Sequence, residues 1–366
     1  MIGWLGEHVA TLGAYLHRID PFAIRFSEGL GLRWYGLSYL AGFAAAYLII
    51  RGMAGRGRSP LPQARVADFI FTVALATVVG GRLGYCIFYD PSRFVEFTKT
   101  FPFWGVLAIH KGGMASHGGI LGIAVGSLIF ARRNGVRLTH LMDLCAFGGV
   151  IGVAFGRAAN FVNGELIGKV ASPSLPWAVK FPQAILEWPR RRPEKLPELA
   201  PVIESIRPEE LGVIVDGATW RAATEPGGAA TPDWVYAALS RVVDLVQRDD
   251  ATGDRAAAML EPFLEPRHPS QIYAGLLEGV AVFAALAVIW AVPRKPGVVG
   301  AWFLILYNGV RIVVDPFRIP DPAIEHELLG ISRVQTLSIL MMLAGAGYLL
   351  WSMRRATEKL GGWRRP

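Results

Sequence analysis

The chain has 366 residues, of which 52 % are hydrophobic and only 18 % are charged, below the roughly 25 % of soluble proteins. Its aromatic content of 11 % and scarce charge exclude disordered, collagenous and coiled-coil proteins, and two cysteines within apolar runs exclude a disulfide framework or a cysteine-based zinc site. The net charge is +8 and the mean hydropathy is +0.37; a basic chain of this kind fits either nucleic acid or a membrane surface, and the distribution of the charge decides between them.

Seven apolar stretches approach the length of about 20 residues that a helix needs to cross a bilayer. The third and the sixth are short and rich in glycine. In chain order, the stretches cover residues 34–51, 66–88, 117–131, 141–161, 271–292, 298–314 and 334–353. The sequence therefore predicts an all-α polytopic membrane protein with seven transmembrane helices.

Basic residues gather in the connections that follow the first, third, fifth and seventh stretches. They are Arg51, Arg56, Arg58, Arg65, Arg132, Arg133, Arg137, Arg294, Lys295, Arg354, Arg355, Lys359, Arg364 and Arg365. Glu358 is the one acid among them. Because alternating spans place these four connections on one side, the positive-inside rule makes that side cytoplasmic, with the N-terminus out and the C-terminus in. Membrane anchoring accounts for the basic charge, and no nucleic-acid partner is expected.

Residues 1–33 are predicted to form an N-terminal arm on the outer surface. They lack the basic start and continuous apolar core of a cleavable signal peptide. Apolar residues at helical spacing predict a short interfacial helix in this arm. These residues are Ile2, Leu5, Val9, Leu12 and Leu16.

Residues 164–267 form a long polar connection between the fourth and fifth spans, predicted to fold as a small extramembrane insertion. Thr231 is predicted to cap a helix that begins at Pro232, and the run from Val213 to Gly217 is typical of a β-hairpin. The helix carries an apolar stripe of Val235, Leu239, Val242 and Val246. The chain thus divides into the arm 1–33, spans one to four in 34–163, the insertion 164–267, and spans five to seven with a cytoplasmic tail in 268–366.

Polar motifs occur at the ends of the predicted spans, and each of these ends is on the outer side in the predicted topology. A charge within a span costs a few kcal/mol and therefore indicates function. The candidates are Tyr35, Arg82, His117, Arg157, Asn160, Asn163, Glu165, His268, Tyr307, Arg311, Asp315 and Arg318. This one-sided arrangement predicts a single polar cavity that opens toward the outer leaflet.

The residue types indicate phosphate chemistry. Arg157 and Arg311 offer planar, permanently charged groups that match a phosphate. Asn160 and Asn163 lie three residues apart on one helix face, and His117 is suited to act as a base near neutral pH. The sequence contains no DDxxD or HExxH motif and no acidic cluster, which argues against a metal-held diphosphate.

The segment 156–168, with the sequence GRAANFVNGELIG, resembles the signature of the prolipoprotein diacylglyceryl transferases. Further segments resemble the same family, at 33–36, 112–119, 268–273 and 307–321. The resemblance extends from about residue 19 to residue 338, except for 184–266.

The resemblance implies a seven-span enzyme of the bacterial inner membrane whose active site faces the outer leaflet. The implied reaction transfers the sn-1,2-diacylglyceryl group of phosphatidylglycerol to the thiol of the lipobox cysteine of a prolipoprotein. Glycerol 1-phosphate is released, in the first step of lipoprotein maturation. The implied partners are phosphatidylglycerol, the lipobox peptide and membrane lipid, without a cofactor or a metal.

The resemblance also implies roles for individual residues. Arg157 and Arg311 match the essential arginines of the family, which we assign to the phosphate, and His117 matches the proposed base. The base stays open, because arginines that lower the pKa of the substrate thiol make a dedicated base unnecessary. Substrate binding or ordering of the site is expected of Tyr35, Asn160, Glu165 and Tyr307, with Arg82 and Asn163 as further candidates.

Structural roles are the alternative for several of these residues. Arg157 and Arg311 can form structural ion pairs with Glu165 and Asp315, and Glu278 is another carboxylate that can pair with an arginine inside the bundle. Arg82 can position a loop or a headgroup, Asn163 can cap a helix, and His117 can serve packing. The sequence departs from the family at Asp315-Pro316, where a Glu and an aromatic residue are common, and in its longer insertion, for which no role is inferred.

Three other functions remain open on the residues alone. A transporter for an anion also suits buried arginines, but it generally needs a midplane site and often an internal repeat. A CDP-alcohol phosphotransferase needs the acidic metal motif that is missing. A non-enzymatic lipid-binding protein has no need of the polar cluster.

Overall fold

The computed structural model describes residues 14–27, 30–109, 112–225, 231–319 and 331–363. The chain separates into two compact units. One, which we call the head unit, comprises Met1–Ser38, Gly156–Gly275 and Val314–Glu327. The other, the bundle unit, comprises Tyr39–Phe155, Leu276–Val313 and Leu328–Pro366.

The described part of the chain is mostly helical and contains six helices that are long and apolar enough to cross a membrane. Many of their apolar side chains are exposed on the protein surface. Phe71, for example, is 70 % exposed. The candidate spans are Trp34–Gly55 with α2, Gln63–Phe88 with α3 (Val66–Phe88), Leu138–Asn163 with α5, Ser270–Ile289 with α12 (Ser270–Ala274) and α13 (Val282–Ile289), Val298–Phe317 with α14 (Val298–Val314), and Arg333–Arg354 with α15. These helices confirm a polytopic membrane protein.

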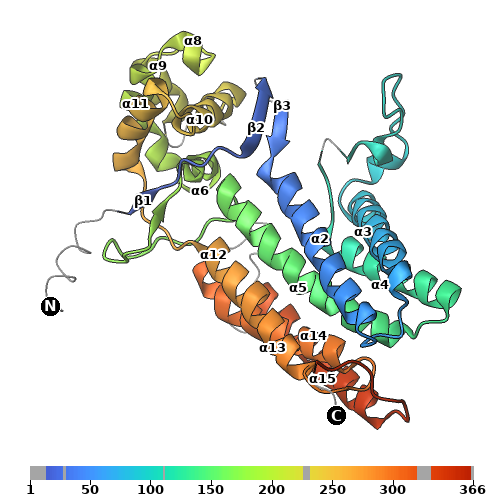
Figure 1. The fold of residues 1–366 in the computed structure, drawn as a ribbon. Helices are drawn as coiled ribbons and strands as arrows, with labels where there is room; N and C mark the ends of the chain where they lie inside the picture. Colours follow the sequence, from blue (N-terminus) through green and yellow to red (C-terminus); the bar gives the residue numbers. More distant parts are fainter. Residues whose placement is uncertain (1–13, 28–29, 110–111, 226–230, 320–330, 364–366) are drawn as a thin grey trace, which may run out of the picture. The chain divides into compact units, whose positions relative to one another are not determined.

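The predicted third stretch forms the helix α4 (Ser116–Asn134), which is not among these six helices. It packs along α3, its neighbour in Figure 1. A Cβ atom added at Gly80, Gly84, Gly118 or Gly122 would collide with the backbone of the facing helix. The two backbones are therefore in direct contact, as small residues permit between membrane helices.

The core of the bundle unit joins helices from distant parts of the chain. The rings of Phe147 and Trp290 pack edge to face with their centroids 5.7 Å apart. Asp143 on α5 accepts hydrogen bonds from the backbone N–H groups of Gly297 and Gly300, at 2.8 and 2.7 Å. Asp143 thereby satisfies two of the unpaired donors that begin α14.

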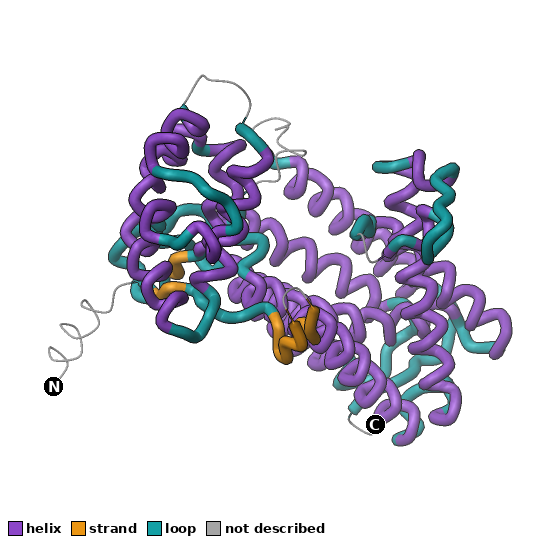
Figure 2. The backbone as a smooth tube through the Cα atoms, turned by 90° about the horizontal axis from the view of Figure 1, so that it is seen from above, coloured by secondary structure: helices purple, strands orange, loops and turns teal. Residues whose placement is uncertain are grey.

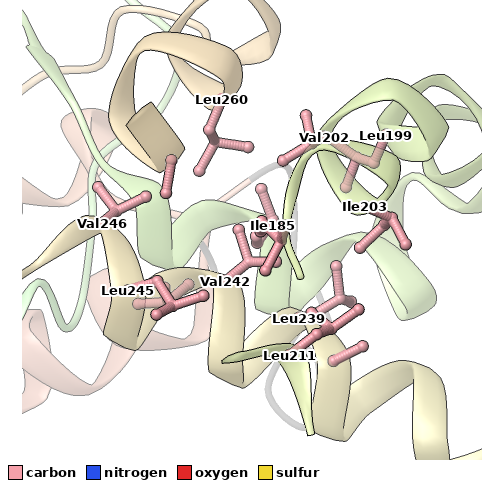
Figure 3. Close-up of a cluster of buried hydrophobic side chains, with 14 of the residues drawn as sticks. Ile185, Leu199, Val202, Ile203, Leu211, Leu239, Val242, Leu245, Val246 and Leu260 are labelled. Atoms are coloured by element: carbon pink, nitrogen blue, oxygen red, sulfur yellow. The ribbon is translucent and has the colours of Figure 1, made fainter. Parts of the chain in front are cut away.

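The head unit contains a helical core, which we call the head core, between residues 185 and 264 (Figure 3). Its helices are α6 (Trp188–Arg191), α7 (Ala200–Ser205), α8 (Pro208–Leu211), α9 (Gly217–Thr224), α10 (Asp233–Val246) and α11 (Ala251–Leu260). The predicted stripe on α10 is fully buried and packs against Ile185, Leu199, Val202, Ile203, Leu211 and Leu260. The helix was therefore predicted correctly from its apolar spacing.

Two local predictions in this region were wrong. The run from Val213 to Gly217 forms no hairpin, because Asp216 caps α9 by accepting the backbone N–H of Thr219 at 2.7 Å. The helix α10 begins at Asp233, so the cap position is Pro232 rather than Thr231. Its ψ of 150° is extended and keeps Pro232 outside the helix.

The N-terminal arm contains short strands that the sequence did not indicate (Figure 2). Most of the predicted interfacial helix lies outside the described residues, and its last member, Leu16, lies in a strand instead. The strand β1 (Tyr15–Leu16) pairs in parallel with β4 (Val179–Lys180), and β2 (Phe22–Ser27) pairs antiparallel with β3 (Leu30–Arg33).

Arg18 attaches the arm to the head core. Its guanidinium donates to the carbonyls of Val246 and Arg248, both at 2.9 Å, and contacts the carboxylate of Asp254 at 2.7 Å. Just before it, His17 is buried between the rings of Phe161 and Phe181. The arm is thus part of the head unit through both polar and aromatic contacts.

Candidate functional site

The signature segment forms the end of α5 and the turn that follows it. The helix ends at Asn163, and Gly164 adopts a left-handed φ of +66°. The N–H of Glu165 then turns back to the carbonyl of Asn160 at 2.9 Å. A side chain at Gly164 would be strained by its φ and would collide with the amide of Gln183. The Asn-Gly pair therefore fits its place as a helix terminus.

Arg157, Asn160 and Asn163 follow one another at intervals of three residues, on one face of the last turns of α5. Asn160 is 7 % exposed and Arg157 is half-buried. Partial burial raises the pKa of Glu165, while a hydrogen bond from the Asn163 side chain and the charge of Arg33 oppose this rise. The Asn163 amide thus contacts the neighbouring carboxylate.

The motif at 268–273 is tied to this turn. The side chain of Gln271 donates to the carbonyl of Glu165 at 2.7 Å, and the Ser270 hydroxyl donates to the carbonyl of Leu166 at 3.0 Å. Two segments about one hundred residues apart in the sequence therefore build one polar turn within the head unit.

Arg82 lies in the bundle unit on α3 and is 3 % exposed. Its guanidinium makes five hydrogen bonds of 2.6–3.3 Å, as many as it has N–H donors. The acceptors are the backbone carbonyls of Gly105, Val106, Ala108, Gly112 and Gly113. Gly113 has a φ of +83°, and a Cβ atom there would lie 2.8 Å from Arg82 Nη1. This arrangement favours a positioning role over direct contact with a phosphate.

His117 lies in the first turn of α4, directly after the segment that Arg82 holds. Its side chain is exposed, and its ring lies against the rings of Phe88 and Tyr89, with centroids 5.4 and 5.9 Å away. The imidazole therefore lies beside the end of α3.

Arg311 forms an ion pair that the sequence left unassigned. Its Nη1 atom lies 2.9 Å from Oε1 of Glu278, which is fully buried. Tyr307 lies one turn before Arg311 on α14, with its ring 5.5 Å from that of Phe303. The lone carboxylate of an apolar span was the available signal for Glu278, but its partner was not evident from the sequence.

The predicted site residues are shared between the two units. The head unit contains Tyr35, Arg157, Asn160, Asn163 and Glu165, and the bundle unit contains Arg82, His117, Tyr307 and Arg311. Their convergence in one cavity stays a prediction. Within the described ranges, no group of three or more His, Cys, Asp or Glu side chains is placed to hold a metal ion.

Comparison with known proteins covers nearly the whole chain. Residues 21–351 match the family described as "Prolipoprotein diacylglyceryl transferase". A protein of Bdellovibrio bacteriovorus named phosphatidylglycerol–prolipoprotein diacylglyceryl transferase is 44 % identical over 352 residues, which are 96 % of this chain and 97 % of that protein. Proteins of the same name from Burkholderia orbicola and Burkholderia ambifaria are 33 % and 34 % identical, each over 92 % of this chain and 95 % of their own length. The chain belongs to the prolipoprotein diacylglyceryl transferase family.

Proposed function

We propose that this chain transfers the sn-1,2-diacylglyceryl group of phosphatidylglycerol to the lipobox cysteine thiol of prolipoproteins and releases glycerol 1-phosphate. The observation that carries the proposal is the 44 % identity with a transferase of that name over 96 % of the chain. The partly buried Arg311 and the Arg–Asn–Asn face that ends α5 offer the phosphate-binding groups that this reaction needs.

The proposed topology has seven spans, with the N-terminus outside and the C-terminus inside. The seventh span is α4, whose backbone contact with α3 along its length suits a membrane pair built from small residues. The basic connections support this orientation. We place the enzyme in the bacterial inner membrane, with its active site toward the outer leaflet and residues 164–267 on the periplasmic side.

The chemical step requires a thiolate, because the neutral thiol is a poor nucleophile. The sulfur attacks the glycerol carbon, a sulfur–carbon bond forms, and the bond between this carbon and the phosphate oxygen breaks. The leaving phosphate keeps the electron pair, and Arg157 and Arg311 stabilise its charge. His117 accepts the thiol proton in this scheme, consistent with its exposed imidazole.

The remaining residues are proposed to bind the substrates or to order the site. Tyr35, Asn160, Glu165 and Tyr307 are proposed to contact the lipid headgroup or the peptide. Asn163 contacts Glu165 and orders the turn at the end of α5. For Arg82 we propose a positioning role, because its donors already engage backbone carbonyls.

A reconstituted transfer assay tests the function. Purified protein in micelles that contain phosphatidylglycerol is mixed with a lipobox peptide, without a nucleotide. We expect mass spectrometry to detect a diacylglyceryl thioether on the cysteine, and glycerol 1-phosphate to accumulate in equal amount. A folded protein that gives neither product contradicts the proposal.

Arg311→Lys tests the phosphate site. Lysine keeps the charge but loses the planar pair of donors, so we expect kcat/KM to fall by about 100-fold, in the range seen when one stabilising donor is lost. Arg65→Lys is the matched control, because Arg65 is exposed and pairs with Asp68 at the start of α3. An Arg311→Lys variant with the wild-type rate would remove Arg311 from the mechanism.

A further inference from the structure

Glu278 is a carboxylate within an apolar span. It is the one charged residue in Ser270–Ile289 and is 0 % exposed. An acid inside a membrane helix costs several kcal/mol unless a partner compensates it. Its presence therefore calls for a specific role.

The backbone around Glu278 is also unusual. Residues Gly275–Ala281 form a π-helical segment within the span, a rare geometry that is frequent at functional sites. The next residue, Gly279, packs directly on α5, where an added Cβ atom would lie 2.7–3.0 Å from atoms of Ala154. The wide turn and this contact fix the place from which the carboxylate extends.

The ion pair with Arg311 is asymmetric. The Glu278 side chain is sealed from solvent, whereas the Arg311 side chain keeps 17 % exposure. A guanidinium has five N–H donors. Among the described residues Arg311 contacts one carboxylate, at 2.9 Å from Nη1, so it keeps donors for a second anion. A sealed anion behind a partly open cation is the arrangement expected when the cation must be held in place for a ligand.

We infer that Glu278 is a positioning residue that orients Arg311 for the phosphate of the lipid substrate. The carboxylate holds one edge of the guanidinium and balances its charge when no lipid is bound. This inference rests on the proposed transferase function and adds a residue that acts through Arg311, without contact with the reacting atoms.

Glu278→Gln removes the charge and keeps the shape. We expect kcat/KM for phosphatidylglycerol to fall at least 10-fold. The KM for phosphatidylglycerol should rise, whereas the KM for the peptide should change less than 2-fold. Glu278→Asp keeps the charge and withdraws the carboxylate by one methylene, so an intermediate loss of a few-fold is expected. If the Gln variant does not fold, the Asp variant alone decides: wild-type kinetics in Glu278→Asp would overturn the inference.

A double-mutant cycle separates positioning from a general structural effect. In an Arg311→Lys background, Glu278→Gln is expected to lower kcat/KM by less than 2-fold, because its effect passes through the lost guanidinium. Multiplicative losses in the double variant would show that Glu278 acts elsewhere and would refute the inference.

Asp143→Asn is the matched control for a buried carboxylate in the same unit. Asp143 binds backbone N–H groups at the other end of α14, so its variant is expected to melt at a lower temperature with an unchanged kcat/KM. The wild-type protein in the same assay separates the two proposals. Absence of transfer by folded wild type contradicts the function itself, whereas active wild type with an equally active Glu278→Gln variant contradicts only the inference.

Discussion

The head core and the bundle unit place their charges in opposite positions. In the head core, Leu239 and its apolar neighbours lie inside, and ion pairs such as Lys195–Glu265 at 2.7 Å lie at the periphery. In the bundle unit, Arg82, Asp143 and Glu278 are buried, while large apolar side chains such as Phe71 are exposed.

This difference reflects the two solvents that the units are built for. Water drives apolar side chains into the head core through the hydrophobic effect. Lipid provides no such force between helices, so the bundle relies on close packing and on polar contacts between helices. A buried charge in the bundle is therefore informative about function or helix order, whereas in the head core it would be a defect.

The largest effect is expected when a charge is placed in the head core. Leu239→Asp buries an uncompensated carboxylate, and we expect it to destabilise the head core by about 5 kcal/mol or more. Limited proteolysis should then cut within residues 185–264 while the bundle unit stays protected. Leu239→Met is the volume-matched control, and resistance of the Asp variant to proteolysis would contradict the assigned core.

Arg82→Lys tests a compensated charge in the bundle unit. Lysine has three donors instead of five, so two carbonyls lose a charged hydrogen bond and the cost is about 4 kcal/mol. We expect a lower melting temperature and faster amide hydrogen exchange in residues 112–115. Unchanged exchange there, relative to wild type, would show that Arg82 does not hold this segment.

His17 is an ionisable side chain that the head unit buries in its neutral form. Burial lowers the pKa of His17 from 6.5 to about 4. Above pH 6.5 His17 is neutral in both the folded and the unfolded state, and the protein has its full stability. As the pH falls from 6.5 toward 4, the unfolded state binds a proton that the folded state does not, and the free energy of unfolding falls by about 3 kcal/mol in total.

The His17→Phe variant is expected to lose this part of the pH dependence. Thermal unfolding at pH 7 and pH 5 measures it, with wild type as the reference. An equal loss of stability in both proteins between these two pH values would assign the effect to another group.

The smallest effect is expected at the periphery of the head unit. Lys180 and Glu261 form an ion pair of 3.1 Å with side chains 21 % and 42 % exposed. Because partly exposed pairs contribute little, Lys180→Ala should change the free energy of unfolding by at most about 1 kcal/mol. A larger loss in denaturant unfolding would show that peripheral pairs do hold this unit together.

Local pattern was sufficient to predict six of the seven apolar spans, the α10 stripe and the family signature, since each depends on spacing along one element. It failed where two local structures compete: Asp216-Gly217 suits a hairpin turn and a helix start equally, and tertiary packing selects the helix. The pairing of β1 with β4 joins segments more than 160 residues apart, which no local pattern encodes.

The candidate site shows the same division. Its arginines were evident from their positions at span ends and from the signature. The role of Arg82 depends on backbone carbonyls, which every residue has and which the sequence therefore does not distinguish. The partner of Arg311 depends on the π-helical turn and on the packing of two spans, so Glu278 was visible as an anomaly without an assigned contact.

The attachment made by Arg18 has a consequence for chain engineering. The residues that accept its hydrogen bonds lie between the last residue of α10 and the first turn of α11, whereas Arg18 itself precedes the first span. The head core therefore cannot be replaced by exchanging residues 185–264 alone. A chimaera that receives the head core of another relative needs the matching residues 15–18 as well. Otherwise three donors of Arg18 lose their acceptors in the head core.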